Sequence, residues 1–151
     1  MRRRNFLYGA SAIGMLTTLP ALAVEPAPEV HVFKNPRCGC CGAWVAHMRS
    51  AGFVVRVAEV HDATVERRRL GMPDRFGSCH TASVGGYVLE GHVPATDVKR
   101  LLATKPKAIG LAVPGMPPSA PGMDTPGRSV PYQVLLVDAA GQTSVFASYP
   151  A

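Results

Sequence analysis

The chain of 151 residues lacks several features that would each point to a common class of protein. Beyond the N-terminal 23 residues, no apolar run is long enough to cross a bilayer, so we expect no membrane contact once that segment is removed. No dense basic stretch is interleaved with aromatics, which argues against a nucleic-acid partner. The only basic cluster in the remaining chain is Arg67-Arg68-Arg69, which a solvated helix face explains. No internal repeat occurs, and the 128 residues that remain of 151 after the first 23 have the size of one domain.

The first 23 residues have the pattern of an export signal. Arg2–Arg4 precede a short, mostly apolar run at Phe6–Leu19, and Pro20–Ala23 ends in a small-x-small cleavage site. The order Arg3-Arg4-Asn5-Phe6-Leu7 also resembles a twin-arginine signal, so the Sec and twin-arginine routes both stay open. We predict a periplasmic protein with a signal peptide at 1–23, a flexible Pro-rich leader at 24–29 and a single domain at 30–151.

Hydrophobic periodicity in the domain predicts alternating strands and helices. The predicted strands are 30–33, 53–60 and 82–89, the last interrupted by a turn or bulge at Gly85-Gly86, and the predicted helices are 42–50, 64–70 and 95–103. Residues 72–81 are predicted as a loop, 105–131 as a long Pro/Gly loop, and 132–137 with 143–148 as a terminal hairpin. This alternation predicts an α/β fold with helices packed on a mixed sheet.

Three of the four cysteines lie together in Cys38-Gly39-Cys40-Cys41, between the first predicted strand and the first predicted helix. A helix N-terminus carries partial positive charge and unpaired N–H groups, both of which stabilise thiolates. The spacing of Cys38 and Cys41 is the C-x-x-C of dithiol redox motifs. Cys79 arrives from a distant loop. Thiolates placed in this way act as nucleophiles or as ligands of soft metals.

The number of thiols favours a metal site over dithiol exchange. A redox enzyme needs two cysteines at this turn, and a third would compete for the disulfide, whereas a Cu(I) site gains from each added thiolate. The adjacency of Cys40 and Cys41 suits neither two structural disulfides nor the paired spacing of structural zinc. Thioredoxin-type enzymes usually have a cis-proline facing C-x-x-C, but Cys79-His80-Thr81 contains no proline.

Five blocks of the chain also carry a resemblance to a known family. They are Lys34–Trp44, Cys79–Ala82, Gly86–Ala95, Gly110–Pro117 and Ser119–Met123. From about Val30 to Phe146 the sequence resembles the exported bacterial metal-binding proteins that include the copper-resistance protein CopG. The resemblance implies a thioredoxin-like fold, a cluster of copper ions bridged by Cys38, Cys40, Cys41 and Cys79, and a role in tolerance of copper or silver.

Further donors are predicted near these cysteines. His80 adjoins Cys79, but successive residues of an extended chain point apart, so both ligation and a structural role stay open for it. Met116 and Met123 lie in the Pro/Gly loop and resemble family residues, which leaves thioether ligands and plain loop anchors as alternatives. His92 is predicted as a structural or hydrogen-bonding residue and His47 as a surface residue. Trp44 and Met48 are predicted in the core, with Trp44 alternatively a hydrophobic wall shielding the site.

Three functions remain open from the sequence. The preferred hypothesis is a periplasmic protein of copper homeostasis and resistance that holds a multinuclear Cu(I) cluster on four cysteines. Its expected partners are metal ions and other periplasmic copper-handling proteins. The alternative is a thiol-disulfide oxidoreductase that uses Cys38 and Cys41. A third hypothesis joins the two as a copper-dependent oxidoreductase that interconverts Cu(I) and Cu(II).

Overall fold

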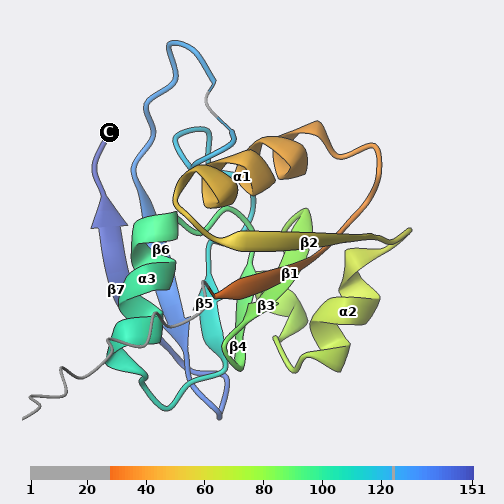
Figure 1. Ribbon diagram of the computed structural model, residues 1–151. Coiled ribbons are helices and arrows are strands. Elements are labelled where there is room, and N and C mark those ends of the chain that lie inside the picture. Colours follow the sequence, from red (N-terminus) through yellow and green to blue (C-terminus); the bar gives the residue numbers. More distant parts are fainter. Residues whose placement is uncertain (1–27, 124) are drawn as a thin grey trace, which may run out of the picture.

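A computed structural model describes residues 28–123 and 125–151, so the predicted signal peptide and most of the predicted leader lie outside the described residues. One mixed sheet has the strand order β2-β1-β3-β4-β5-β6-β7 (Figure 1). The strands are β1 (Glu29–Lys34), β2 (Val54–Glu59), β3 (His80–Val84), β4 (Tyr87–Glu90), β5 (Gly110–Ala112), β6 (Tyr132–Val137) and β7 (Thr143–Tyr149). The helices are α1 (Gly39–Ser50), α2 (Ala63–Arg69) and α3 (Ala95–Thr104), with a 3-10 turn, η1, at Asp74–Phe76.

The connections match the predicted thioredoxin-like arrangement. β1 and β2 are parallel and joined through α1, and β3 pairs antiparallel with β1. β3 and β4 form a hairpin, and α3 then leads to β5, which runs parallel to β4. β6 and β7 form the predicted terminal hairpin, which extends the sheet beyond β5. The predicted α/β class is therefore confirmed.

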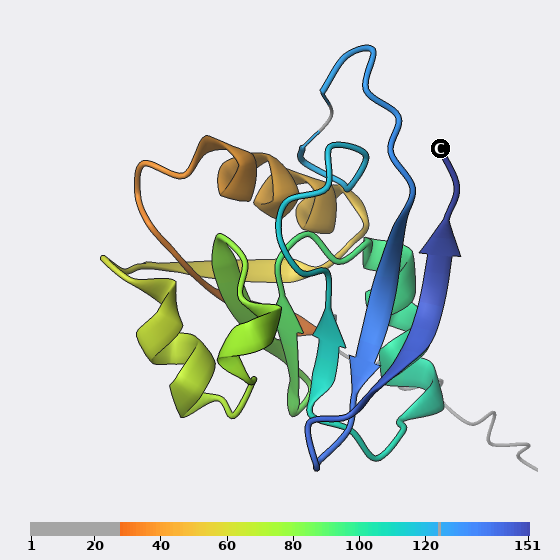
Figure 2. The ribbon, with the colours of Figure 1, turned by 180° about the vertical axis from the view of Figure 1, so that it is seen from behind.

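Alternation along the strands divides the core between the two sheet faces. One hydrophobic cluster joins α1 and α3 to the sheet and contains Trp44, Met48 and Leu101. A smaller cluster contains Val88 of β4 together with Met72 and Phe76, which come from the segment that follows α2. Figure 2 shows the sheet from behind, with the segment between β5 and β6 lying beside α1 as it does in Figure 1. None of the helices in the described part of the chain combines the length and hydrophobicity that a membrane crossing requires.

Several predicted element boundaries are wrong. β1 begins at Glu29, inside the predicted leader, and α1 begins at Gly39 instead of residue 42. The buried face of α1 is Cys41, Trp44, Val45 and Met48, so its apolar stripe starts with a cysteine that the periodicity did not count as apolar. β3 begins at His80, within the predicted loop 72–81.

Two longer predicted segments also need correction. The Gly-Gly turn separates two strands, β3 and β4, within the predicted strand 82–89. The Pro/Gly loop contains the short strand β5, whose three residues give too little periodicity to be recognised. The arginine cluster is not a uniform solvated face, because Arg67 is buried while Arg68 and Arg69 are exposed and paired with acidic residues.

Gly110 gives a test of the β4–β5 pairing. It lies opposite Val88, and a Cβ at this position would lie 1.8 Å from the Val88 carbonyl oxygen. We expect Gly110→Ala to lower the free energy of unfolding by about 2–3 kcal/mol, because two backbones must separate. Chemical denaturation measures it, with Gly42→Ala as the control, since a Cβ on Gly42 meets no atom within 4 Å. The free energy of unfolding of the Gly42→Ala control should rise by about 0.5–1 kcal/mol, because alanine favours the helix more than glycine does. Equal midpoints for wild type and Gly110→Ala would contradict this pairing.

Candidate metal centre

A short turn places the first three cysteines at the start of α1. Pro36 follows Asn35, whose side-chain oxygen accepts the N–H of Arg37 at 2.9 Å, while its carbonyl accepts the N–H of Cys38 at 3.0 Å. Cys38 is the extended N-cap residue of α1, and no side chain caps this end of the helix. The first turn of α1 contains no acidic residue. The positive end of the helix dipole is therefore uncompensated where the sulfurs gather.

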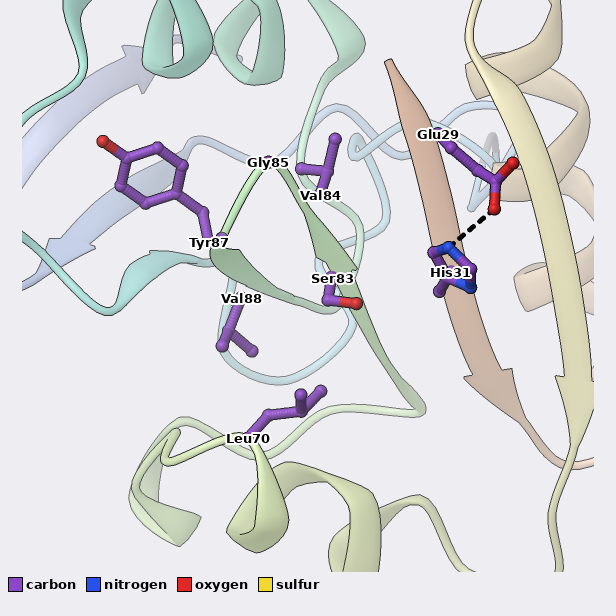
Figure 3. Close-up of a pocket in the computed structure, with 9 residues that line it drawn as sticks. Glu29, His31, Leu70, Ser83, Val84, Gly85, Tyr87 and Val88 are labelled. Atoms are coloured by element: carbon purple, nitrogen blue, oxygen red, sulfur yellow. Dashed lines mark ion pairs between the residues drawn. The ribbon is translucent and has the colours of Figure 1, made fainter.

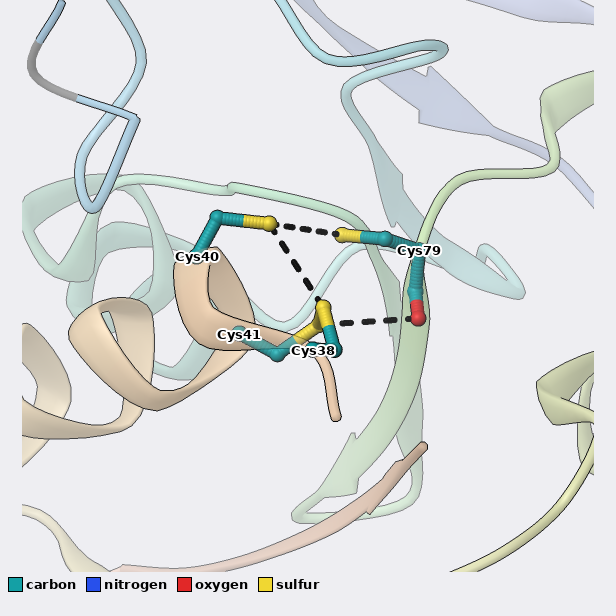
Figure 4. A group of neighbouring side chains, drawn as sticks. All are labelled: Cys38, Cys40, Cys41 and Cys79. Carbon is teal, nitrogen blue, oxygen red and sulfur yellow. Dashed lines mark hydrogen bonds between the residues drawn. A yellow bond between two sulfur atoms is a disulfide. The ribbon is translucent and has the colours of Figure 1, made fainter. Parts of the chain in front are cut away.

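The structure brings all four cysteines together (Figure 4). Their sulfurs lie within 4.8 Å of one another. Cys40 Sγ is 3.5 Å from Cys38 Sγ and 3.9 Å from Cys79 Sγ. Cys79 faces the helix N-terminus from the loop before β3, and its carbonyl oxygen lies 3.6 Å from Cys41 Sγ. The predicted juxtaposition of these residues is present, and their role as ligands stays a prediction.

Two of these sulfurs are joined in the structure. Cys38 and Cys41 form a disulfide, whereas Cys40 and Cys79 are free. Disulfide sulfurs are not thiolates, so a site of four thiolates forms only after two electrons from a reductant cleave this bond; the two thiolates become thiols if they then take up two protons. The donor set is thus oxidised in one half and reduced in the other.

Two buried histidines extend the group of donors. His92 Nε2 lies 3.1 Å from Cys79 Sγ, and His80 Nδ1 lies 3.4 Å from the same sulfur. His92 Nδ1 donates to the Pro121 carbonyl at 2.8 Å, because that oxygen can only accept. The other ring nitrogen of His92, Nε2, faces Cys79. Within the described residues, His80 Nε2 is buried without a hydrogen-bond partner.

The prediction for His92 was incomplete. It does make hydrogen bonds, but it also belongs with Cys79 and His80 to a second group of donor atoms within 4.8 Å. The sequence held a signal for this position: β3 and β4 pair antiparallel, with Thr81 opposite Glu90, so residues just before β3 meet residues just after β4. If Gly85-Gly86 is taken as the turn of a β-hairpin, the antiparallel register places His92 beside Cys79.

Burial determines the protonation of this second group. It raises the pKa of the Cys79 thiol to about 12, an effect to which the facing Cys40 also contributes. Burial lowers the pKa of His80 to about 3, with the nearby His92 adding to the shift. At neutral pH both groups are uncharged in the metal-free protein. A metal ion must therefore displace the Cys79 proton to bind its sulfur, while the imidazole of His80 needs no deprotonation.

An apolar side chain of the core packs beside His80. Trp44 is fully buried, its indole N–H donates to the Val93 carbonyl at 2.9 Å, and its ring centroid is 4.4 Å from that of His80. The prediction that Trp44 lies in the core is thus confirmed, and its ring also packs against His80. Met48 lies in the same hydrophobic cluster, as predicted. His47 is half-buried and not a plain surface residue, since it accepts the N–H of Ala95 at the start of α3.

The Pro/Gly loop lies against the site. The Gly115 carbonyl accepts the Ser78 hydroxyl at 2.5 Å, next to Cys79, and the Pro121 carbonyl binds His92. A Cβ on Gly122 would lie 2.5 Å from the Trp44 backbone nitrogen, so the loop meets α1 directly. Met116 is 54% exposed and Met123 packs against the main hydrophobic cluster. Packing explains Met123 as an anchor, and thioether ligation stays a prediction for both residues.

A separate surface pocket lies elsewhere on the sheet. It has a volume of about 360 Å³ and is lined by residues of β1, β3 and β4 together with Leu70 (Figure 3). His31 in this pocket is exposed and lies 2.7 Å from Glu29. No cysteine or methionine lines it, so its chemistry does not suit a soft metal ion.

Comparisons with known proteins identify the family of this chain. A family described as "Protein of unknown function, DUF411" matches residues 76–123, while a search of curated proteins gave no match. The solved structure "Copper resistance protein copG- Form 2" is 40% identical and has a TM-score of 0.78, covering 82% of this chain and 99% of its own. Form 1 is 41% identical with the same TM-score, covering 84% and 100%. Because the likeness spans both relatives almost completely, this chain belongs to the CopG family of copper resistance proteins.

Proposed function

We propose that this protein holds more than one Cu(I) ion on the thiolates of Cys38, Cys40, Cys41 and Cys79 in the periplasm, as part of copper homeostasis. The observation that carries the proposal is the convergence of four sulfurs within 4.8 Å at an uncapped helix N-terminus. Thiolates are the ligands that Cu(I) prefers, and a site with few competing oxygen donors favours it further.

The close spacing of the sulfurs supports more than one ion. Cys40 lies between Cys38 and Cys79, at 3.5 Å and 3.9 Å, so each of its neighbours can share a metal ion with it. Four thiolates bring four negative charges into a half-buried site, and several monovalent cations neutralise them better than one. Silver(I), with the same charge and softness, is the second ion that this donor set suits.

Histidine and methionine supply the remaining donors of the proposal. His92 and His80 each face Cys79 with a ring nitrogen, and the loop that carries Met116 and Met123 contacts residues next to Cys79. The export signal predicted at residues 1–23 supports the periplasmic location. Other periplasmic copper-handling proteins are the partners that such a carrier would exchange ions with.

Metal titration tests the proposal directly. Protein reduced and kept anaerobic should bind more than one Cu(I) per chain in competition with a Cu(I) chelator, because all four sulfurs are then available. The same protein with the Cys38–Cys41 disulfide intact should bind fewer ions, since two donors are missing. Binding should release protons, because the Cys79 thiol is protonated beforehand. No Cu(I) binding by the reduced protein, or a preference for Zn(II), would refute the proposal.

A second function is favoured by the disulfide itself. Cys38 and Cys41 are joined in the C-x-x-C pairing that a thiol-disulfide oxidoreductase uses. In that reaction one reduced cysteine attacks a substrate disulfide, a mixed disulfide forms, and the second cysteine resolves it, so the substrate leaves as two thiols and the enzyme as the disulfide. Cys40 Sγ, 3.5 Å from Cys38 Sγ, would compete as a resolving thiol in this mechanism.

Serine variants separate the two functions. On the copper proposal, each of the four Cys→Ser variants loses Cu(I) ions and the wild type reduces insulin poorly. On the exchange hypothesis, Cys40→Ser keeps insulin reduction and Cys38→Ser abolishes it, because only the C-x-x-C pair is needed. Insulin turbidity with a dithiol reductant and parallel copper analysis measure both. Robust turnover by the wild type would favour the exchange hypothesis.

Leucine variants test the loop methionines. Met116→Leu with Met123→Leu keeps apolar volume while removing both thioethers, so the loop can still anchor on the core. If a thioether binds copper, Cu(I) should transfer to excess chelator about tenfold faster than from wild type. Met48→Leu is the matched control, because Met48 is fully buried in the core. Transfer as slow as in wild type would assign both loop methionines to anchoring alone.

A further inference from the structure

A buried ion pair lies behind the loop that carries Cys79. Arg67 Nη2 is 3.0 Å from Glu90 Oε1, and the two side chains are 6% and 0% exposed. Burying two charges costs desolvation free energy, and their mutual attraction does not reliably offset this cost. Such a pair therefore contributes little to the stability of the fold. A buried pair of this kind is better understood from the groups that it holds in place.

Both members of the pair hold the backbone of Ser78. Its N–H donates to Glu90 Oε1 at 2.6 Å, and its carbonyl accepts from Arg67 Nη2 at 3.0 Å. Its hydroxyl donates to the Gly115 carbonyl at 2.5 Å. All the polar groups of the residue that precedes Cys79 are thus fixed by neighbours from three other segments.

The same carboxylate holds the chain on the other side of Cys79. Glu90 Oε2 accepts the Thr81 hydroxyl at 2.6 Å, and Thr81 is the register partner of Glu90 across the β3–β4 hairpin. One side chain therefore bridges residues 78 and 81, on either side of Cys79. The fixed end of β4 determines where the backbone of Cys79 lies.

The position of Cys79 matters because its sulfur is the only one of the four that does not come from the α1 turn (Figure 4). Its distance of 3.9 Å to Cys40 Sγ depends on two separate pieces of chain. A shift of about 1 Å at such a ligand is enough to loosen a metal site. A rigid support behind Cys79 is what a shared metal site across this gap requires.

We propose that Arg67 and Glu90 are positioning residues that hold Cys79 against the α1 cysteines, so that it closes the copper site. The pair touches no donor sulfur and acts through the backbone of Ser78 and through Thr81. This inference rests on the proposed function in naming copper as the bound ion. The placement of Cys79 itself is a property of the metal-free protein and can be tested without copper.

The metal-free test measures access to Cys79. In Cys40→Ser protein with the Cys38–Cys41 disulfide intact, Cys79 is the one free thiol. Adding Arg67→Met with Glu90→Leu removes both charges and leaves neither buried alone. Alkylation of Cys79 by iodoacetamide should become roughly fivefold faster, because a displaced Cys79 is reached more easily by the reagent and by water, and both access and the thiolate fraction determine the rate. An unchanged rate in a folded variant, judged by circular dichroism, would overturn the proposal.

The copper test uses the pair variant with and without Cys79. In protein that retains all four cysteines, Arg67→Met/Glu90→Leu should transfer Cu(I) to excess chelator about tenfold faster. In Cys79→Ser protein the same change should add nothing, because the residue that it positions no longer binds. Equal acceleration in both backgrounds would mean general loosening and would overturn the proposal. Failure of the wild type to bind Cu(I) would refute the proposed function alone, and alkylation would then decide this inference.

Two further sets of variants serve as controls. Arg68→Met with Asp74→Asn removes the neighbouring exposed ion pair, in which Arg68 Nη2 lies 2.6 Å from Asp74 Oδ2, and should leave both rates at wild-type values. If the buried double variant does not fold, Thr81→Val removes a single hydrogen bond to Glu90 and should accelerate both reactions less strongly. Thr81→Ser should restore the wild-type rates. If Thr81→Val reacts at the same rates as Thr81→Ser and wild type, the proposal is overturned.

Discussion

The antiparallel pairing of β1 with β3 is the constraint on which the site depends. Lys34 at the end of β1 lies opposite His80 at the start of β3. The turn to Cys38 leaves from one of these strand ends and Cys79 enters the other, so a single register brings the two cysteine segments together. A slip of one residue would turn every side chain of β3 to the opposite face, so that His80 could not face Trp44. The buried alternation of Val30, Val32, Ala82 and Val84 stabilises this register.

The sequence predicted the elements well where the apolar pattern was long. The helix from Ala95 and the terminal hairpin came from clear periodicity, and the cysteine turn was placed correctly between strand and helix. The start of α1 was missed because its first turn consists of glycine and cysteine, which carry little hydrophobic signal. β5 was missed because three residues between prolines and glycines show no period.

Pairing between distant residues accounts for the larger errors at the site. Arg67 looked like one of three equivalent surface arginines, and only its partner Glu90, 23 positions further on, distinguishes it. His92 looked structural because its relation to Cys79 exists only after the hairpin forms. Local propensity carries no information about such contacts, whereas the register of β3 with β4 does. The four cysteines were found because residue type alone identifies a soft donor.

The disulfide between Cys38 and Cys41 connects two equilibria that are usually treated apart. On the proposed function, copper binds only to the reduced form of these two residues, so bound copper stabilises that form by mass action. The midpoint potential of the pair then depends on the free copper concentration, and it rises by about 30 mV for each tenfold gain in the stability of the reduced form. The redox state of the same two sulfur atoms would thereby depend both on the copper supply and on the thiol-disulfide balance of the compartment.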